Sequence, residues 1–175
     1  MKNTTKTALC GIIAALATAF MLLSYFPYLT YAIPAVAGLF MVILVIEINL
    51  KWAIGAYFAS AVLVMIFAET EAKMMYVFFF GYYPILKAAL ERIRKPVIEW
   101  VLKFIVFNAA VLAVYWGLAL LFDMSFADFG ELGRYGGYIL LAAANVVFLL
   151  YDIAVSRMAA LYVMRLHPRI KKMLK

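Results

Sequence analysis

Charged side chains that could form ion pairs or transfer protons recur within the apolar segments of this chain. They are Lys87, Glu91, Glu99, Lys103, Asp152 and Arg157. Lys87 precedes Glu91 by four residues, as Glu99 precedes Lys103, and residues four apart lie on one face of an α-helix. Ionisable groups inside a membrane are costly unless they pair or line a pathway. The spacing therefore predicts a structural ion-pair network near the inner ends of three helices, with a proton or substrate relay as the alternative.

Aromatic rings and one amide form a second set, which could stack on a flat heterocycle and form hydrogen bonds with its edge. Its members are Tyr25, Tyr28, Tyr31, Tyr76, Phe79, Asn108 and Tyr115. Asn108 and Tyr115 are two helical turns apart, so they share a stripe that could form a polar wall. Tyrosine and tryptophan also collect at membrane interfaces. Ligand binding and membrane anchoring are therefore both interpretations of these side chains.

Small side chains recur at every fourth residue, from Thr7 through Gly11 and Ala15 to Ala19. On a helix they form one stripe, and in lipid such a stripe lets a second helix approach closely and pack by van der Waals contact. The second helix can belong to this chain or to a partner protein. For such stripes in general, we favour packing within the chain.

Several kinds of catalytic site are disfavoured by what the sequence lacks. Cys10 is the only cysteine and His167 the only histidine, so one chain cannot form a disulfide or the usual zinc site. His167 lies in the basic C-terminal segment, and no P-loop, HExxH or GxSxG motif occurs. We therefore expect no enzymatic activity, no cofactor and no metal, and any active transport must take its energy from partner proteins.

The composition is that of an integral membrane protein. Of the 175 residues, 69% are hydrophobic and 14% charged, against about 25% charged in an ordinary soluble domain. The formal charge is +7, but the basic residues lie between apolar segments and at the two ends, which argues against nucleic acid as a partner. A helix needs about 20 mainly apolar residues to cross a membrane. Six segments qualify, at about residues 5–24, 32–48, 50–68, 74–90, 97–122 and 138–164.

The basic residues determine the predicted orientation, because short loops rich in Lys and Arg stay in the cytoplasm. With six spans, Lys51, Arg92, Arg94 and Lys95 fall on the same side as the basic residues of both ends. We therefore predict an all-α integral membrane protein in which residues 1–175 form one domain. It is a compact bundle of six transmembrane helices, surrounded by lipid in the cell membrane of a bacterium, with both termini cytoplasmic.

Local features qualify this topology. Residues 17–19, Ala-Thr-Ala, could end a signal peptide, but the apolar run continues to Leu23, which favours a retained first span. Gly81 and Pro84 interrupt the fourth segment, and Pro84 cannot donate a backbone hydrogen bond, so a kink is expected there. Glu47, near the end of the second segment, is expected to extend to the membrane interface.

The first segment and its surroundings resemble the S components of energy-coupling factor (ECF) transporters, the substrate-binding membrane subunits of vitamin importers. The resemblance begins with an Ala-rich segment from Thr7-Ala8-Leu9 to Ala19, in which Ala15 and Ala19 match an Ala-xxx-Ala pattern. Pro27, Pro34 and the apolar second and third segments follow. The resemblance implies the same short six-helix fold.

The resemblance also implies partners and a ligand. Gly11, Ala15 and Ala19 would face a transmembrane coupling subunit, two cytoplasmic ATPases would power the cycle, and Tyr25 to Tyr31 would lie over a small-molecule ligand. The sequence has no diagnostic ligand motif. It also lacks the N-terminal His-containing segment of metal-transporting members, which disfavours a metal ion as substrate.

Two other functions fit the same residues. A structural membrane protein of the cell envelope, similar to the compact bundles of the cell-shape proteins, would use the aromatic side chains as anchors and the charged residues as a docking surface. A self-contained proton-coupled carrier would use Asp152 and Lys103. A co-purified small molecule favours the importer subunit, whereas stability that depends on a partner without any ligand favours the scaffold.

Overall fold

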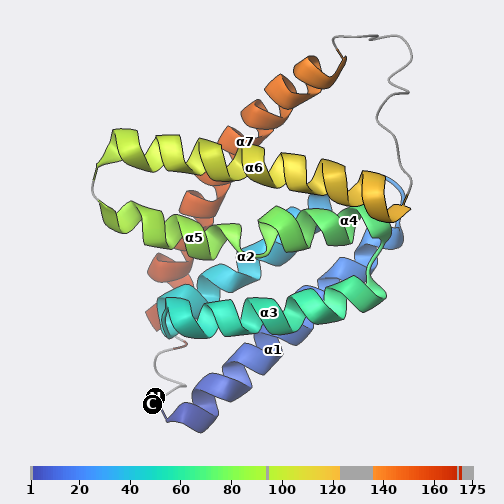
Figure 1. Cartoon of the computed structure of the whole chain (residues 1–175). Helices are drawn as coiled ribbons and strands as arrows, with labels where there is room; N and C mark the ends of the chain where they lie inside the picture. Colours follow the sequence, from blue (N-terminus) through green and yellow to red (C-terminus); the bar gives the residue numbers. More distant parts are fainter. Residues whose placement is uncertain (1, 94, 123–135, 169, 171–175) are drawn as a thin grey trace.

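The computed structural model describes residues 2–93, 95–122, 136–168 and 170, and within these ranges it is helical and contains no strand (Figure 1). The predicted all-α class is therefore confirmed for this part of the chain. The elements in order are α1 (Asn3–Met21), η1 (Leu22–Tyr25), α2 (Ala32–Glu47), α3 (Leu50–Phe67), α4 (Thr70–Met75), η2 (Tyr76–Phe80), α5 (Tyr83–Leu90), η3 (Glu91–Ile93), α6 (Pro96–Phe122), α7 (Gly136–Leu161) and η6 (Tyr162–Leu166).

Side-chain caps explain where two of these helices begin. The Asn49 side chain accepts a hydrogen bond from the Trp52 backbone N–H at 3.1 Å, which allows α3 to start directly after α2. Glu69 accepts from the Ala72 N–H at 3.0 Å in the same way. The helix therefore starts at Thr70, and the predicted start at residue 74 was too late.

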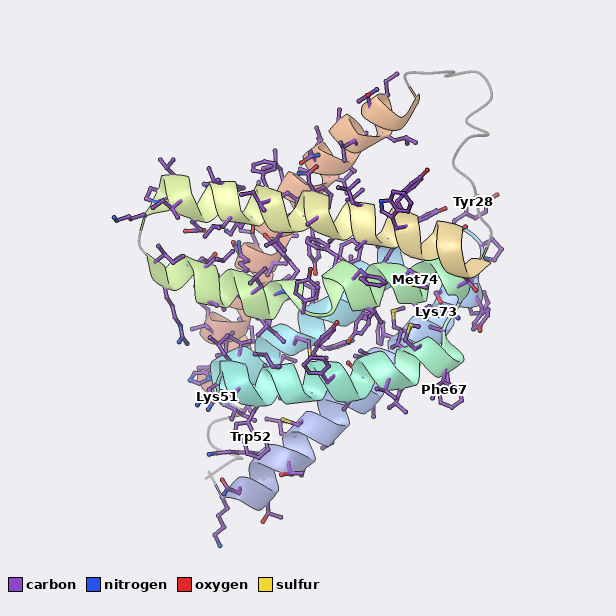
Figure 2. The ribbon with its side chains drawn as sticks, in the orientation of Figure 1. Tyr28, Lys51, Trp52, Phe67, Lys73 and Met74 are labelled. Carbon is purple, nitrogen blue, oxygen red and sulfur yellow. The ribbon has the colours of Figure 1, made fainter. Side chains whose placement is uncertain are left out.

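The helices run back and forth between two ends of the bundle (Figure 1). One end holds the turn between α2 and α3, the turn between α5 and α6, and the two ends of the described chain. Figure 2 labels Lys51 and Trp52 at this end, with Tyr28 and Phe67 at the other. We call the first the basic end and the second the tyrosine end. This alternation is what a chain crossing a membrane repeatedly requires.

The described chain contains four helices that are long and apolar enough to cross a membrane, at Asn3–Tyr25, Leu50–Phe67, Pro96–Gly117 and Tyr138–Leu166. The apolar helix α2 is shorter. The exterior is also apolar: Phe58, Val62 and Ile66 lie one turn apart on α3 and are exposed. Large exposed apolar surfaces are rare on soluble monomers, so this exterior favours a lipid environment.

The core has two parts. Small side chains, among them Ala17, Ala37 and Ala53, are fully buried where α1, α2 and α3 pack together. A second, aromatic part joins η2, α5, α6 and α7, and in it the rings of Phe107 and Phe148 stack with their centroids 4.6 Å apart. The aromatic part lies directly beside the charged residues described below.

The fourth predicted span is interrupted near the expected position. A π-helical turn, η2, ends with the Gly81 N–H donating to the Tyr76 carbonyl at 2.8 Å, and α5 begins anew at Tyr83 with Pro84 in its first turn. At this break the backbone of η2 lies against Gly38 of α2, where an added Cβ would overlap the Phe80 carbonyl oxygen. Glycine at position 38 therefore permits the close approach of α2 to η2.

Candidate functional site

Two lysines and one aspartate meet inside the bundle. Lys87 is 3% exposed, Lys103 1% and Asp152 4%. Lys87 Nζ lies 2.5 Å from Asp152 Oδ1, and Lys103 Nζ lies 3.2 Å from the same oxygen. The Tyr83 hydroxyl also donates to Asp152 Oδ1, at 2.5 Å. One carboxylate of α7 thus holds both lysines, from α5 and α6, together.

Two further acids surround this centre. Lys103 Nζ lies 2.6 Å from Glu99, and Lys87 Nζ lies 3.0 Å from Glu91, both at the predicted spacing of four residues. Glu91 is also 3.7 Å from Lys103, and its side chain is 47% exposed. We call Tyr83, Lys87, Glu91, Glu99, Lys103 and Asp152 the charge cluster. Two cations face three carboxylates, and the surplus negative charge can be hydrated at Glu91.

The geometry of the charge cluster favours a structural role. Every buried side-chain nitrogen and oxygen in the described part of the chain has a hydrogen-bond partner, and this includes the buried atoms of Lys87, Lys103 and Asp152. Charges buried in this way hold α5, α6 and α7 in one arrangement, because separating them would expose each charge to an apolar environment. No group of three His, Cys, Asp or Glu residues that could hold a metal ion occurs among the described residues.

Arg157 does not belong to the charge cluster, although we predicted that it would. It lies exposed on α7 and forms no ion pair with the acids that the structure describes. It follows Asp152 by five positions, which places it about 140° around the helix axis, at about 100° per residue. The two side chains therefore point in different directions, and only Asp152 faces α5 and α6.

The predicted ligand-binding residues do not gather in one pocket. Tyr76 is fully buried with its hydroxyl 2.8 Å from that of Ser60, and Phe79 is packed in the aromatic core. Asn108 exchanges two hydrogen bonds with Asn145 of α7, at 3.1 and 3.2 Å. These side chains fill the interior or pair with polar side chains of neighbouring helices, because their helix faces turn inward. The predicted polar wall is not formed.

The other four tyrosines of that prediction lie at the surface. Tyr25 donates to the Phe67 carbonyl at 3.2 Å, and Tyr31 donates to Glu71 at 2.8 Å. Tyr28 is 97% exposed and has a positive φ of 70°. Figure 2 labels it at the tyrosine end of the bundle. The hydrogen bond to Glu71 raises the pKa of Tyr31 above its ordinary value. Tyr115, on α6, is exposed beside Trp116. The segment between α1 and α2 is thus fastened to the tyrosine end of α3 and α4.

The small residues of α1 face outward. Gly11, Ala15 and Ala19 are exposed, and a Cβ placed at Gly11 would meet nothing within 4 Å. The buried face of the helix is instead formed by Ile13, Ala14, Ala17 and Met21. The general preference for packing such stripes within the chain is therefore wrong here. This outward face of α1, the small-residue stripe, is open in the described chain.

Sequence reasoning missed a second buried acid. The Glu47 side chain is only 4% exposed; its Oε1 accepts from the Tyr162 hydroxyl at 2.8 Å and lies 2.9 Å from His167 Nδ1. Glu47 therefore does not extend to the membrane interface. His167 is part of a polar contact between α2 and the residues that follow α7. No local spacing could reveal this contact, because its members are 115 and 120 residues apart.

The described residues thus present a largely buried charge cluster, an outward small-residue stripe and a tyrosine-rich segment at the opposite end from the basic turns. No protein-family model, curated protein or solved structure matches this chain.

Proposed function

We propose that this chain is the substrate-binding membrane subunit of an ECF-type importer for a vitamin or another small micronutrient. A transmembrane coupling subunit and two cytoplasmic ATPases would supply the energy. The subunit would lie in the plasma membrane of a bacterium with six spans and both termini in the cytoplasm. The observation that carries the proposal is the small-residue stripe on the outer face of α1.

The arrangement of the helices supports six spans. The four long apolar helices would be four of these spans. Helix α2 would be a fifth, and the consecutive helical segments α4, η2 and α5 would together form the sixth. Residues 70–90 extend over about 30 Å at 1.5 Å per residue, which equals the thickness of the hydrocarbon core. Lys51 lies at the same end of the bundle as both ends of the described chain, and so does the turn between α5 and α6, which carries Arg92 and Lys95 (Figures 1 and 2). Positive charge at one end favours that end as cytoplasmic.

The small-residue stripe supports docking of a partner helix. Association in lipid depends on close van der Waals packing, and glycine and alanine let two backbones approach. In this chain α1 packs against α2 and α3 with its other face, so the stripe is accessible without any rearrangement. A partner that is itself a membrane subunit, such as the coupling subunit, fits an apolar surface of this kind.

Ala15→Trp is expected to reduce the recovery of the partner complex from native membranes by about tenfold, since overpacking an interface costs about 1–3 kcal/mol. The measurement is the molar ratio of ATPase subunits to this chain after affinity purification in mild detergent. Ala143→Trp is the matched control, because Ala143 is also exposed but lies on α7. Equal recovery with both variants would contradict docking through α1.

The ligand is tested separately by native mass spectrometry of the detergent-purified protein, followed by denaturing extraction. A stoichiometric heterocycle or vitamin-like molecule is expected. Tyr28→Ala is then expected to lower its occupancy severalfold, because Tyr28 projects from the segment that the resemblance places over the ligand. Tyr138→Ala, at an exposed tyrosine of α7, should leave occupancy unchanged.

A scaffold of the cell envelope is the second candidate, and one observation favours it. Asn108, Tyr76 and Phe79 are engaged with other side chains of the chain itself, so these predicted ligand contacts are already occupied. If purification retains lipid alone while Ala15→Trp still removes a membrane partner, the scaffold is the better description.

A further inference from the structure

A groove of about 850 Å³ lies between α2 and the C-terminal end of α7 with η6. Its lining is apolar except at one place, and consists of Val36, Leu39, Phe40, Val42, Ile43, Met158, Leu161, Tyr162, Met164, Arg165 and Leu166. Val36, Met158, Leu161 and Met164 are exposed at its edges, so the groove opens to the exterior of the bundle. From Val36 to Ile43 it follows α2 for about 10 Å, at 1.5 Å per residue.

Arg165 is the charged side chain in this lining. Met158, Tyr162 and Arg165 are spaced by four and three residues and so follow one face of the helix. The π-helical turn Tyr162–Leu166 adds a residue to the last turn, and both Arg165 and Leu166 reach the groove. The otherwise apolar groove therefore contains one guanidinium group, in the C-terminal part of its lining.

The Arg165 side chain is exposed and has no carboxylate partner among the described residues. Glu47, whose partner Tyr162 also lines the groove, is held by Tyr162 and His167. An apolar groove that contains one cation without an acidic partner in the described part of the chain is complementary to an amphiphile with an anionic head.

We propose that the groove binds an acyl chain of an anionic phospholipid, with the phosphate on Arg165. Apolar chains fit the side chains of α2 and α7, and guanidinium groups bind phosphate oxygens in pairs. Arg165 lies towards the basic end of the bundle, where anionic lipids are attracted to Lys and Arg near the membrane surface. The lipid would hold the end of α7 against α2, next to the contact between Glu47 and His167.

Lipid titrations followed by native mass spectrometry test this site. The probes are dioleoyl phosphatidylglycerol and dioleoyl phosphatidylcholine, which share acyl chains and differ in charge. The purified protein is expected to bind the anionic lipid about fivefold more tightly, the effect of one basic residue near a membrane surface. Arg165→Gln should abolish this preference. Arg157→Gln, at an exposed arginine of α7 outside the groove, should preserve it.

A second pair of variants tests the apolar lining of the groove. Met158→Trp fills it and should weaken binding of both lipids severalfold, while Ile153→Trp, exposed on α7 away from the groove, should not. Thermal unfolding establishes that each variant is folded, and if Met158→Trp is not, the two arginine variants decide. Equal loss of preference with Arg157→Gln and Arg165→Gln would show diffuse attraction and overturn the proposal. Inorganic phosphate displacing the lipid completely, or a second copy of the chain replacing it, would overturn it as well.

Discussion

Asp152→Asn is expected to lower the free energy of unfolding by about 3–5 kcal/mol, the cost of removing one partner from a buried ion pair. Asparagine keeps the size of the side chain and an oxygen that can accept from Tyr83. What it removes is the negative charge that Lys87 and Lys103 share at 2.5 and 3.2 Å. Both lysines then remain buried with less compensation.

Unfolding in mixed micelles, followed by tryptophan fluorescence, measures this loss. Glu91→Gln is the matched control: it also replaces an acid of the charge cluster by its amide, but Glu91 is half exposed. Its expected cost is about 0–1 kcal/mol, as for exposed ion pairs. Adding Lys87→Met to Asp152→Asn should recover part of the stability, because the uncompensated cation is removed. Strictly additive effects would show that charge pairing does not hold this cluster together.

Gly38→Ala is expected to cost about 3 kcal/mol, at the upper end of what overpacking usually costs. The added Cβ would overlap the Phe80 carbonyl oxygen and lie 2.9 Å from its carbonyl carbon and 3.1 Å from the Tyr151 hydroxyl. Backbone atoms cannot rotate away as a side chain can, so α2 must move from η2. This shift would also disturb the aromatic core that adjoins Asp152.

Replacing a glycine by alanine at Gly11 should instead raise the free energy of unfolding. Gly11→Ala adds a Cβ to open space on α1, and alanine is favoured over glycine within a helix by about 0.5–1 kcal/mol. The comparison in one unfolding assay therefore isolates the contact at Gly38 from the general effect of replacing glycine. A stabilised Gly38→Ala protein would mean that α2 and η2 are not in close contact.

Much of the local structure follows from the sequence because its causes are local. The length of each apolar run predicts a helix, and α2, α3 and α6 begin and end within about one residue of the predicted bounds. Pro84 interrupts its helix wherever that helix lies, since it lacks a backbone donor. The pairs Lys87–Glu91 and Glu99–Lys103 depend only on the spacing of four residues along one helix.

The sequence by itself thus determined the helical class, the position of the interruption and the short-range ion pairs of this protein. Only the tertiary structure decided that Asp152 joins both lysines, that Arg157 points elsewhere, and that the small-residue stripe faces outward. It also decided that the predicted ligand residues separate between the core and the surface. The physical reason is that spacing determines the angle between side chains around one helix axis, whereas the rotation of that helix towards its neighbours depends on the packing of the whole bundle.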